Sequence, residues 1–472
     1  MPGTVSKEKN TNLSPSTGKT KKKKSLFQRL TRYLLYTLGS ILFLLVFLFL
    51  AARTDTFNRW LLEKTVNSLN SSLASNESVV FANSLEGNIF TGLRLIGGNV
   101  LVKQDTLLKF DSLEVSYDIL SLLNKKIVLK KIALESPQIN LTKVRSRGDT
   151  LLWNFEYMLR TEKVKTDTAK TPFDWGIYIH DLVLHNADIR IIGSNPTGIP
   201  ARKVKMARLK SFDLNNLDIT DLDADIEAVY SSDLKMLNVK SLRLNTNSDF
   251  AIEKLNFLAK ADPSDTTVRL SSFDLATKKT KLSIGYIYMN NFDPFGSINY
   301  EDFKNNSVKI HLSSDNISFQ DLKFFLPELD FMDGSVALTL DADGNYGDLD
   351  VKKCLIKTHS SYLNLKGKVQ NLSDPDKLYL DITAQNMVLD PADTKNLLPG
   401  LSIPDFSSLG KVYADVQYTG EPWNFTTVFE VKSSAGNASG SLQLDVGKVK
   451  GSVPDEGLYV GWRTRGRGHH TQ

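Results

Sequence analysis

Eleven residues, Gly334-Ser-Val-Ala-Leu-Thr-Leu-Asp-Ala-Asp-Gly344, alternate between apolar and polar side chains between two glycines. The pattern returns without gaps as Gly410-Lys-Val-Tyr-Ala-Asp-Val-Gln-Tyr-Thr-Gly420. Successive side chains of a β-strand point to opposite faces, so each copy predicts a strand with one apolar and one polar face.

Similar flanks surround the two copies. A Leu-Pro-x-Leu element precedes them, beginning at Leu326 and at Leu398. A Gly-x-apolar-Gln element follows them, beginning at Gly367 and at Gly440. An internal repeat of this kind predicts an elongated, stacked antiparallel β-sheet.

The apolar face of these strands needs a cover, because burying one such side chain contributes roughly 1.5–3 kcal/mol. Helical patterns are few and short. They occur at Ile119–Leu123, Trp153–Arg160, Leu322–Leu326 and Ala392–Leu398. Two solutions remain: a sandwich or barrel that closes on itself, or a groove filled by acyl chains. Composition alone favours the sandwich. The apolar face contains Val336, Leu338 and Leu340 in one copy and Val412, Ala414, Val416 and Tyr418 in the other.

A second repeat lies nearer the N-terminus, with its copies fifty residues apart. Each copy predicts a strand, a one-residue phase slip and further strand, and the slip could be a bulge or a tight turn. Five apolar residues, Leu209, Phe212, Leu214, Leu217 and Ile219, form a weaker third copy. The first two copies are Ile127, Leu129, Ile132, Leu134, Ile139 and Leu141, and Ile177, Ile179, Leu182, Leu184, Ile189 and Ile191.

One uncharged apolar run, Tyr33 to Ala52, stands close to the N-terminus. A helix of twenty residues is about 30 Å long, which matches the hydrocarbon core of a bilayer. The run is longer than the apolar part of a signal peptide and lacks a clean small-x-small cleavage site, so it predicts an uncleaved anchor. Leu62, Val66, Leu69 and Leu73 follow at helical spacing and predict a short amphipathic helix.

Positive charge is concentrated ahead of this run. Residues 1–32 hold nine Lys/Arg and one acidic residue, so they contribute +8 to a net charge of +5 and leave −3 for residues 33–472. This asymmetry predicts a cytoplasmic N-terminus and a bulk beyond the membrane. It also argues against nucleic acid as a partner. The residues that set the topology are Lys21, Lys22, Lys23, Lys24, Arg29 and Arg32.

The expected organisation has six parts. They are a disordered basic cytoplasmic tail (1–32), a transmembrane helix (33–52), an amphipathic helix with a linker (53–78), two β blocks (79–320 and 321–450) and a disordered or foreign tail (451–472). The last part loses the alternation and carries two of the six histidines, which is typical of a foreign or frame-shifted end on a truncated chain.

Catalytic, metal and cofactor signals are weak, and we expect none of these sites. Asp341 to Asn345 resemble the start of a calcium loop, but Tyr346 and Lys352 stand where an EF-hand needs Gly and an acidic residue, so a polar turn is expected. His180 and His185 have the wrong spacing for one strand face. The single cysteine, Cys354, is expected to be a buried strand thiol.

The N-terminal elements, in their order, resemble a known family. After the anchor and helix come Ser84-Leu-Glu-Gly-Asn-Ile-Phe-Thr-Gly-Leu93, Leu113-Glu-Val-Ser-Tyr-Asp118, Ser136-Pro-Gln-Ile-Asn-Leu141 and Gly148-Asp-Thr-Leu-Leu-Trp-Asn-Phe155. The chain is similar to the N-terminal part of TamB-type proteins of the AsmA-like superfamily, in a Bacteroidetes-like version. The resemblance is strongest over about residues 25–195 and continues by repeat character to about 445.

The resemblance implies a long β-sheet curled into a taco-like groove with an apolar interior. It implies an inner-membrane anchor, a periplasmic bulk and phospholipid as a partner, for lipid transport to, or assembly of, the outer membrane. An outer-membrane barrel protein is the further partner that the family's C-terminal region is expected to contact, and that region is absent from this chain. The alternative is a structural scaffold with a self-closed β-sandwich core. On the groove model, lipid contacts the first two copies of the fifty-residue repeat, without the third, and Val336, Leu338, Leu340, Val412 and Val416 of the other repeat.

Overall fold

The computed structural model describes residues 26–145, 150–159, 175–193, 200–262, 267–290, 306–345, 347–372, 374, 377–445 and 461–463. The chain divides into two compact units, Met1–Thr54 and Asp55–Gln472. The described part of the first unit is helical, and the described part of the second is dominated by strands.

The first unit contains the helix α1 (Leu26–Ala51), which begins before Tyr33. Its described side chains are mostly apolar and exposed, and Phe43 exposes 74% of its surface. Among the described residues, no single helix is long and apolar enough to cross a membrane. Tyr36–Ala51 and Asp55–Ser72 meet that requirement only together, as a broken span. The transmembrane helix therefore stays a prediction.

The boundary of the predicted disordered tail needs a correction. The helix α1 already includes residues 26–32, because the leucine, glutamine and arginine residues there are good helix formers. Lys21–Lys24 lie outside the described residues. Arg29 and Arg32 fall within α1, but their side chains are not described.

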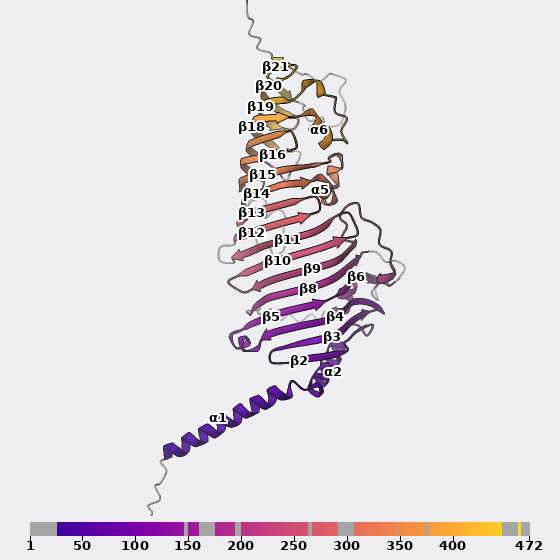
Figure 1. Ribbon diagram of the computed structural model, residues 1–472, viewed down its shortest axis with the longest axis vertical. Coiled ribbons are helices and arrows are strands. Elements are labelled where there is room, and N and C mark those ends of the chain that lie inside the picture. Colours follow the sequence, from indigo (N-terminus) through magenta and orange to yellow (C-terminus); the bar gives the residue numbers. More distant parts are fainter. Residues whose placement is uncertain are drawn as a thin grey trace, which may run out of the picture. The chain divides into compact units, whose positions relative to one another are not determined.

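The second unit is mainly β. Its strands form one long, mostly antiparallel sheet, and its helices are few and short (Figure 1). The strands are β1 (Ser78–Phe81), β2 (Ser84–Asn88), β3 (Gly92–Val102), β4 (Asp105–Asp118), β5 (Lys126–Glu135), β6 (Gln138–Arg145), β7 (Leu151–Trp153), β8 (Gly176–Ile192), β9 (Asn216–Tyr230), β10 (Lys235–Thr246), β11 (Ala251–Asp262), β12 (Thr267–Thr277), β13 (Lys281–Asn290), β14 (Ser307–Ser318), β15 (Ser335–Asn345), β16 (Asp348–Lys357), β17 (Tyr362–Gln370), β18 (Tyr379–Leu389), β19 (Val412–Glu421), β20 (Asn424–Ser433), β21 (Gly436–Asp445) and β22 (Gly461–Arg463).

The helical segments of the second unit are α2 (Asp55–Ser72), η1 (Ile119–Asn124), α3 (Asn154–Leu159), η2 (Ala201–Lys203), α5 (Phe319–Phe325), η3 (Pro327–Phe331), α6 (Pro391–Leu397) and η5 (Ser407–Leu409). Five of them overlap the predicted ones, and three short 3₁₀ turns, η2, η3 and η5, were not predicted. The boundary expected between residues 320 and 321 does not interrupt the sheet, because β14 pairs with β15 across it. In the tail expected to be disordered or foreign, β22 pairs with β21, and the other residues from 446 onward lie outside the described part.

The fifty-residue repeat corresponds to an exception in the antiparallel order. Strand β8 pairs in parallel with β5 and then with β6, so that equivalent residues of the two copies are direct cross-strand partners. Ile132 lies opposite Leu182, for example, and Ile139 opposite Ile189. The phase slip is an interruption between β5 and β6 at Ser136, which has a φ of 47°. The N–H of Ser136 donates to the carbonyl of His185 at 2.9 Å.

The third copy of this repeat is wrong as a strand prediction. Leu209, Phe212 and Leu214 lie in an irregular segment between η2 and β9, and Leu214 is 58% exposed. The N–H of Phe212 donates to the carbonyl of Phe324, at 2.6 Å, rather than to a neighbouring strand. Leu217 and Ile219, the remaining two residues of the copy, do lie in β9.

The repeat of Gly334–Gly344 and Gly410–Gly420, which contains β15 and β19, is confirmed by the backbone conformation. Gly344 and Gly420 end the two copies with φ angles of 139° and 136°. A Cβ atom on either glycine would lie 2.3 Å from a carbonyl oxygen of the next strand, that of Asp348 or of Asn424. Only glycine tolerates this conformation and this close approach, which explains its presence at both turns.

Each of the helices α5 and α6 holds the preceding hairpin turn through a carboxylate. Asp321 accepts hydrogen bonds from the hydroxyls of Thr277 and Thr280, at 2.6 and 2.7 Å. The matching residue of α6, Asp393, accepts from the hydroxyl of Thr358 and, at 2.8 and 2.9 Å, from the N–H of Ser360 and the hydroxyl of Ser361. These donors belong to the turn between β16 and β17. The duplication therefore extends to the helix that covers the end of each hairpin.

The carboxylate of Asp393 is held in its ionised form. Burial opposes ionisation, but the hydrogen bonds from the turn outweigh it, so the pKa of Asp393 lies below its ordinary value. The pKa is thus lower in the folded than in the unfolded chain. The network stabilises the fold above a pH of about 4. It loses this contribution as the pH falls through the lower native pKa.

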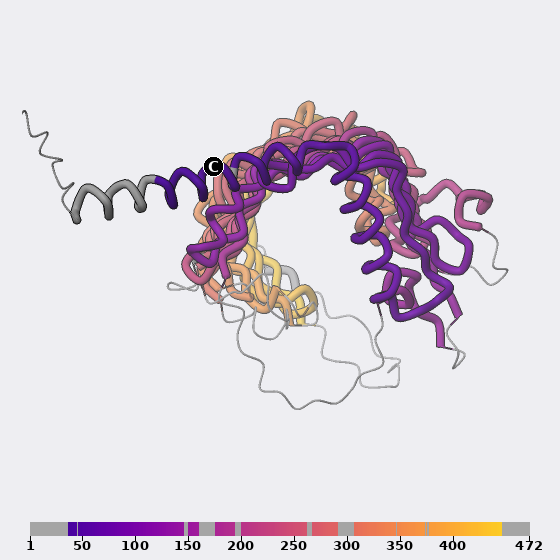
Figure 2. The backbone as a smooth tube through the Cα atoms, turned by 90° about the horizontal axis from the view of Figure 1, so that it is seen from below, coloured from indigo at the N-terminus to yellow at the C-terminus, as the bar shows by residue number. Residues whose placement is uncertain are grey.

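Within the second unit, the strands superpose along a common curved path when viewed end on (Figure 2). Bulges in the ladders bend the strands and contribute to this curvature. Two of them match: Asn186 in β8 and Asn386 in β18 have φ angles of 50° and 53°. The N–H of each donates to an aspartate of the next strand, Asp223 at 2.9 Å and Asp415 at 2.6 Å.

Asp393→Ala is expected to loosen the turn between β16 and β17 together with α6, because hydrogen bonds to a charged group contribute roughly 1.5–3 kcal/mol each. Amide exchange over residues 352–397 should accelerate by about tenfold or more. Hydrogen–deuterium exchange mass spectrometry of the full chain measures this rate. Asp330→Ala is the control, since that side chain is 92% exposed. Equal exchange in the two variants would contradict the capping role.

Candidate apolar binding surface

One face of the sheet is apolar, and exposure follows the alternation of the sequence. In β19, Ala414 is buried and Val416 half-buried, whereas Tyr413 and Asp415 are exposed. In β20 the same two-residue period places Phe429 among the half-buried positions. The predicted faces are therefore confirmed in β19. In β15, Ser335 to Asp341 are all half-buried, and Val336, Leu338 and Leu340 share one side by strand geometry.

Directly opposed residues continue this apolar face from strand to strand. We call the resulting line of cross-strand partners the central row. Each residue in it is paired with the next by the ladder register, except Phe257 and Phe273, which meet across a bulge with ring centroids 6.2 Å apart. The central row consists of Leu93, Val115, Ile132, Leu182, Ile226, Val239, Phe257, Phe273, Ile284, Leu312, Leu340, Cys354, Leu365, Ala384, Val416 and Phe429.

The central row is apolar yet incompletely buried. Val239, Ile284 and Ala384 expose less than a tenth of their surface, and the other members are half-buried. Among the described residues, the hydrophobic core cluster is small and consists of Ala384, Met387 and Ala414 with partly buried neighbours. A closed core would bury such side chains much further. The face therefore leaves apolar surface within reach of a ligand.

The residues predicted to contact lipid are all half-buried. Ile132, Leu182, Leu340 and Val416 belong to the central row, and most of the others flank it on the same face. Those beyond the break at Ser136, namely Ile139, Leu141, Ile189 and Ile191, pair in register but stand outside the row.

Sequence reasoning missed the middle of the row, between β9 and β14. Phe257, Phe273 and Ile284 lie there in alternating strands without a clear internal repeat, so that only the alternation itself could have indicated them. Phe429 was missed for the same reason, because β20 lies between the repeat elements.

The opposite face is polar and carries exposed ion pairs. Lys131 and Glu114 lie 3.1 Å apart across β4 and β5. Lys352 pairs with Asp350 and, at 3.3 Å, with Asp343, and these carboxylates raise the pKa of the lysine. Asp343 thus belongs to a strand ladder rather than to the polar turn that its sequence suggested.

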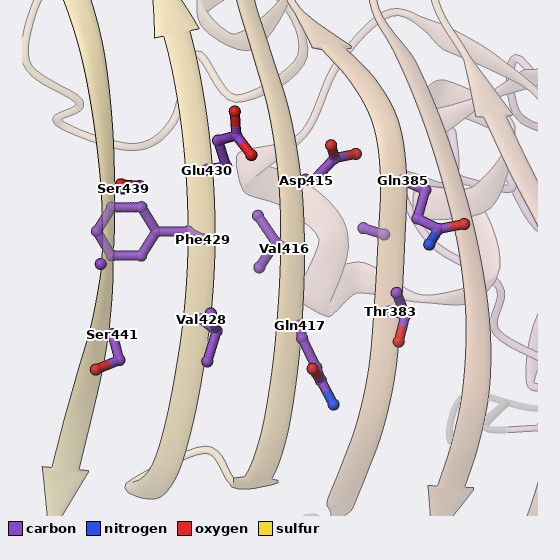
Figure 3. Close-up of a pocket in the computed structure, with 12 residues that line it drawn as sticks. Thr383, Gln385, Asp415, Val416, Gln417, Val428, Phe429, Glu430, Ser439 and Ser441 are labelled. Carbon is purple, nitrogen blue, oxygen red and sulfur yellow. The ribbon is translucent and has the colours of Figure 1, made fainter.

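A shallow depression of about 670 Å³ lies on β18 to β21. It is lined by members of the central row, by Gly440 and by their immediate chain neighbours, most of which are polar (Figure 3). Asp415 and Glu430 lie directly opposite each other there. The N–H of Asn386 donates to Asp415, and Lys432 pairs with Glu430 at 3.1 Å, which offsets the repulsion between the two carboxylates. The depression therefore presents mostly polar side chains next to the apolar residues of the central row.

Metal ligands do not gather in the described part of the chain, where no group of three or more His, Cys, Asp or Glu side chains is placed to hold an ion. His185 approaches Asp223 at 3.7 Å, and the carbonyl of His180 accepts a hydrogen bond from Lys240 at 3.1 Å. Comparison with known proteins matched no family model, no curated protein and no solved structure.

Cys354 offers a native probe of the central row, since it is the single cysteine of the chain. Burial raises the pKa of its thiol, so less of the reactive thiolate is present at neutral pH. We expect N-ethylmaleimide to alkylate Cys354 several-fold more slowly at pH 7.5 than a thiol on the polar face, and the rate to rise at higher pH.

The matched control carries Cys354→Ser with Lys353→Cys, because Lys353 is exposed and lies opposite Asp341 on the polar face. Alkylation is followed by intact mass spectrometry of the full chain. Equal rates and equal pH profiles for the two thiols would contradict the assignment of the faces.

Proposed function

We propose that this chain is an inner-membrane-anchored periplasmic protein that carries phospholipid towards the outer membrane, or assists outer-membrane assembly. It binds the phospholipid along an apolar β-groove and catalyses no reaction. In this proposal the sheet is the curled groove of a TamB-type protein of the AsmA-like superfamily, and the apolar face lies on the inside of its curve.

The observation that carries the proposal is the continuity of the central row. From Leu93 to Phe429, each residue of the row meets the next across a strand pair, by ladder register or, for Phe257 and Phe273, by contact of their rings, and most of these side chains are only half-buried. An acyl chain on such a face exchanges one apolar contact for the next and loses little hydrophobic energy as it moves. Its polar headgroup stays in water, which avoids the cost of burying it unpaired.

The anchor part of the proposal is supported by α1. Its large apolar side chains are exposed from Tyr36 to Leu50, which is costly in water and favourable in a bilayer. The concentration of Lys and Arg ahead of the apolar run supports a cytoplasmic N-terminus and a periplasmic sheet.

The alternative is a scaffold whose sheet closes on itself as a sandwich. A sandwich needs two facing sheets whose inner residues are buried. The described strands belong to one continuous sheet, and the central row is half-buried, which favours the open groove.

The full chain, labelled at Cys354 with benzophenone maleimide and irradiated in membranes that contain ³²P-phospholipid, is expected to form a protein–phospholipid adduct. The variant with Cys354→Ser and Lys353→Cys, labelled in the same way, should give several-fold less adduct, because its label is on the polar face. Adducts are measured by autoradiography of the denatured protein. The absence of an adduct at Cys354, or equal adducts from both sites, would overturn the proposal.

Leu338→Asp distinguishes the groove from the self-closed scaffold. On an open face the new carboxylate keeps contact with water, so exchange in β14 to β16 should stay within a few-fold of the parent while the phospholipid adduct at Cys354 is lost. In a closed core, a buried unpaired charge costs several kcal/mol and would accelerate exchange across these strands. Thr339→Asp, on the polar face, is the matched control and should change neither measurement.

A further inference from the structure

A cavity of about 820 Å³ lies beside α6, at the end of β18 and the start of β19. This volume falls within the range of small-molecule sites, which are typically lined by apolar side chains with a few polar groups. The apolar part of the lining includes Leu389, Leu398, Leu401, Ile403, Phe406 and Val412.

The cavity adjoins the apolar face of the sheet. Two of its lining residues, Leu389 and Val412, are cross-strand partners. The next pair on the same face of this ladder is Met387 with Ala414, the two residues that complete the core cluster with Ala384 of the central row. Apolar surface therefore continues from the central row to the cavity.

Both repeats have a hollow beside the short helix, but the one beside α5, of about 650 Å³, has a mostly polar lining, whereas the one beside α6 has a mostly apolar lining. Asp321 and Asp393 hold equivalent turns, and this match places Phe324 of α5 at the position of Asn396 in α6. Phe324 is 5% exposed and stacks on Phe250 with ring centroids 5.2 Å apart. In the second repeat, the smaller and polar Asn396 lines the cavity.

The side chains around the cavity remain accessible. Leu401 is 47% and Phe406 46% exposed, although both line an apolar space. Exposed apolar surface around a preformed hollow is typical of a binding site. Among the described lining residues, the exposed Lys395 is accompanied by two acidic residues, Asp333 and Asp405, so the charged part of the lining is not net positive.

We propose that this cavity binds one acyl chain of a lipid. The chain could belong to a free fatty acid or to a phospholipid, since both present the same chemistry. The inference rests on the proposed function in one respect, namely that lipid reaches the cavity along the apolar face. The cavity then holds a chain at a fixed place, whereas the central row lets it move.

Asn396→Phe tests the inference, because it installs in α6 the side chain that α5 carries at this position. The full chain is irradiated with a diazirine-bearing palmitate, or with phosphatidylglycerol vesicles whose acyl chain bears the diazirine, and adducts are mapped by peptide mass spectrometry. We expect adducts within residues 389–412, and a decrease of roughly tenfold or more in Asn396→Phe.

Ala392→Phe is the matched control, because Ala392 is exposed on the same helix and does not line the cavity. It should leave the adducts in residues 389–412 unchanged, and hydrogen–deuterium exchange checks that both variants keep α6 folded. Labelling by only one of the two probes identifies the source of the acyl chain and supports the site.

The absence of adducts in residues 389–412, or adducts that Asn396→Phe does not reduce, overturns the inference. The outcome is separable from that of the proposed function. A phospholipid adduct at Cys354 without one in the cavity supports the proposed transport and contradicts the cavity site. An adduct in the cavity without one at Cys354 contradicts the proposed transport and supports the cavity site.

Discussion

The structure depends on one constraint: in every strand, the alternate residues that are apolar must point to the same face of the sheet, from one end of the sheet to the other. We call this agreement between strands their parity. A strand that slipped by a single residue would turn its apolar residues to the polar face. The ladder between Leu312, Leu340 and Cys354 keeps this parity directly. Where a strand carries an extra residue, a bulge absorbs it, as at Asn386, and Ala384 still meets Val416 in the next strand.

The devices that preserve parity act locally. Gly344 and Gly420 fix the turns that follow the two repeat strands, and Asp321 and Asp393 tie a short helix to each preceding hairpin. Each device contacts only neighbouring strands, so the stability of the sheet is close to a sum of local terms. Such a sheet can lengthen by repetition without a growing central core, which suits a surface that must be long rather than enclosed.

The sequence predicted the strands well where its pattern was periodic, and poorly where the chain follows neighbours that are distant in sequence. Ile132 and Leu182 were recognised as equivalent, and the fold makes them cross-strand partners, because two copies of one strand pattern pair well in parallel register. Phe212 and Leu214 also alternate, yet they form no strand, because the backbone of Phe212 bonds to that of Phe324, far away in the chain. The central row across β9 to β14 depends on register, which a single strand's pattern does not specify.

The two repeats also separate what the fold requires from what it permits. Asp321 and Asp393 are the same residue type because a single carboxylate accepts two or more hydrogen bonds from the donors of each turn. Three residues later the requirement ends. Phe324 stacks on Phe250 and lines a mostly polar hollow, whereas the equivalent Asn396 lines a mostly apolar cavity. A change at this position leaves the cap, the turn and the ladder intact, so the rim of the sheet can acquire a site of its own while the central row stays continuous.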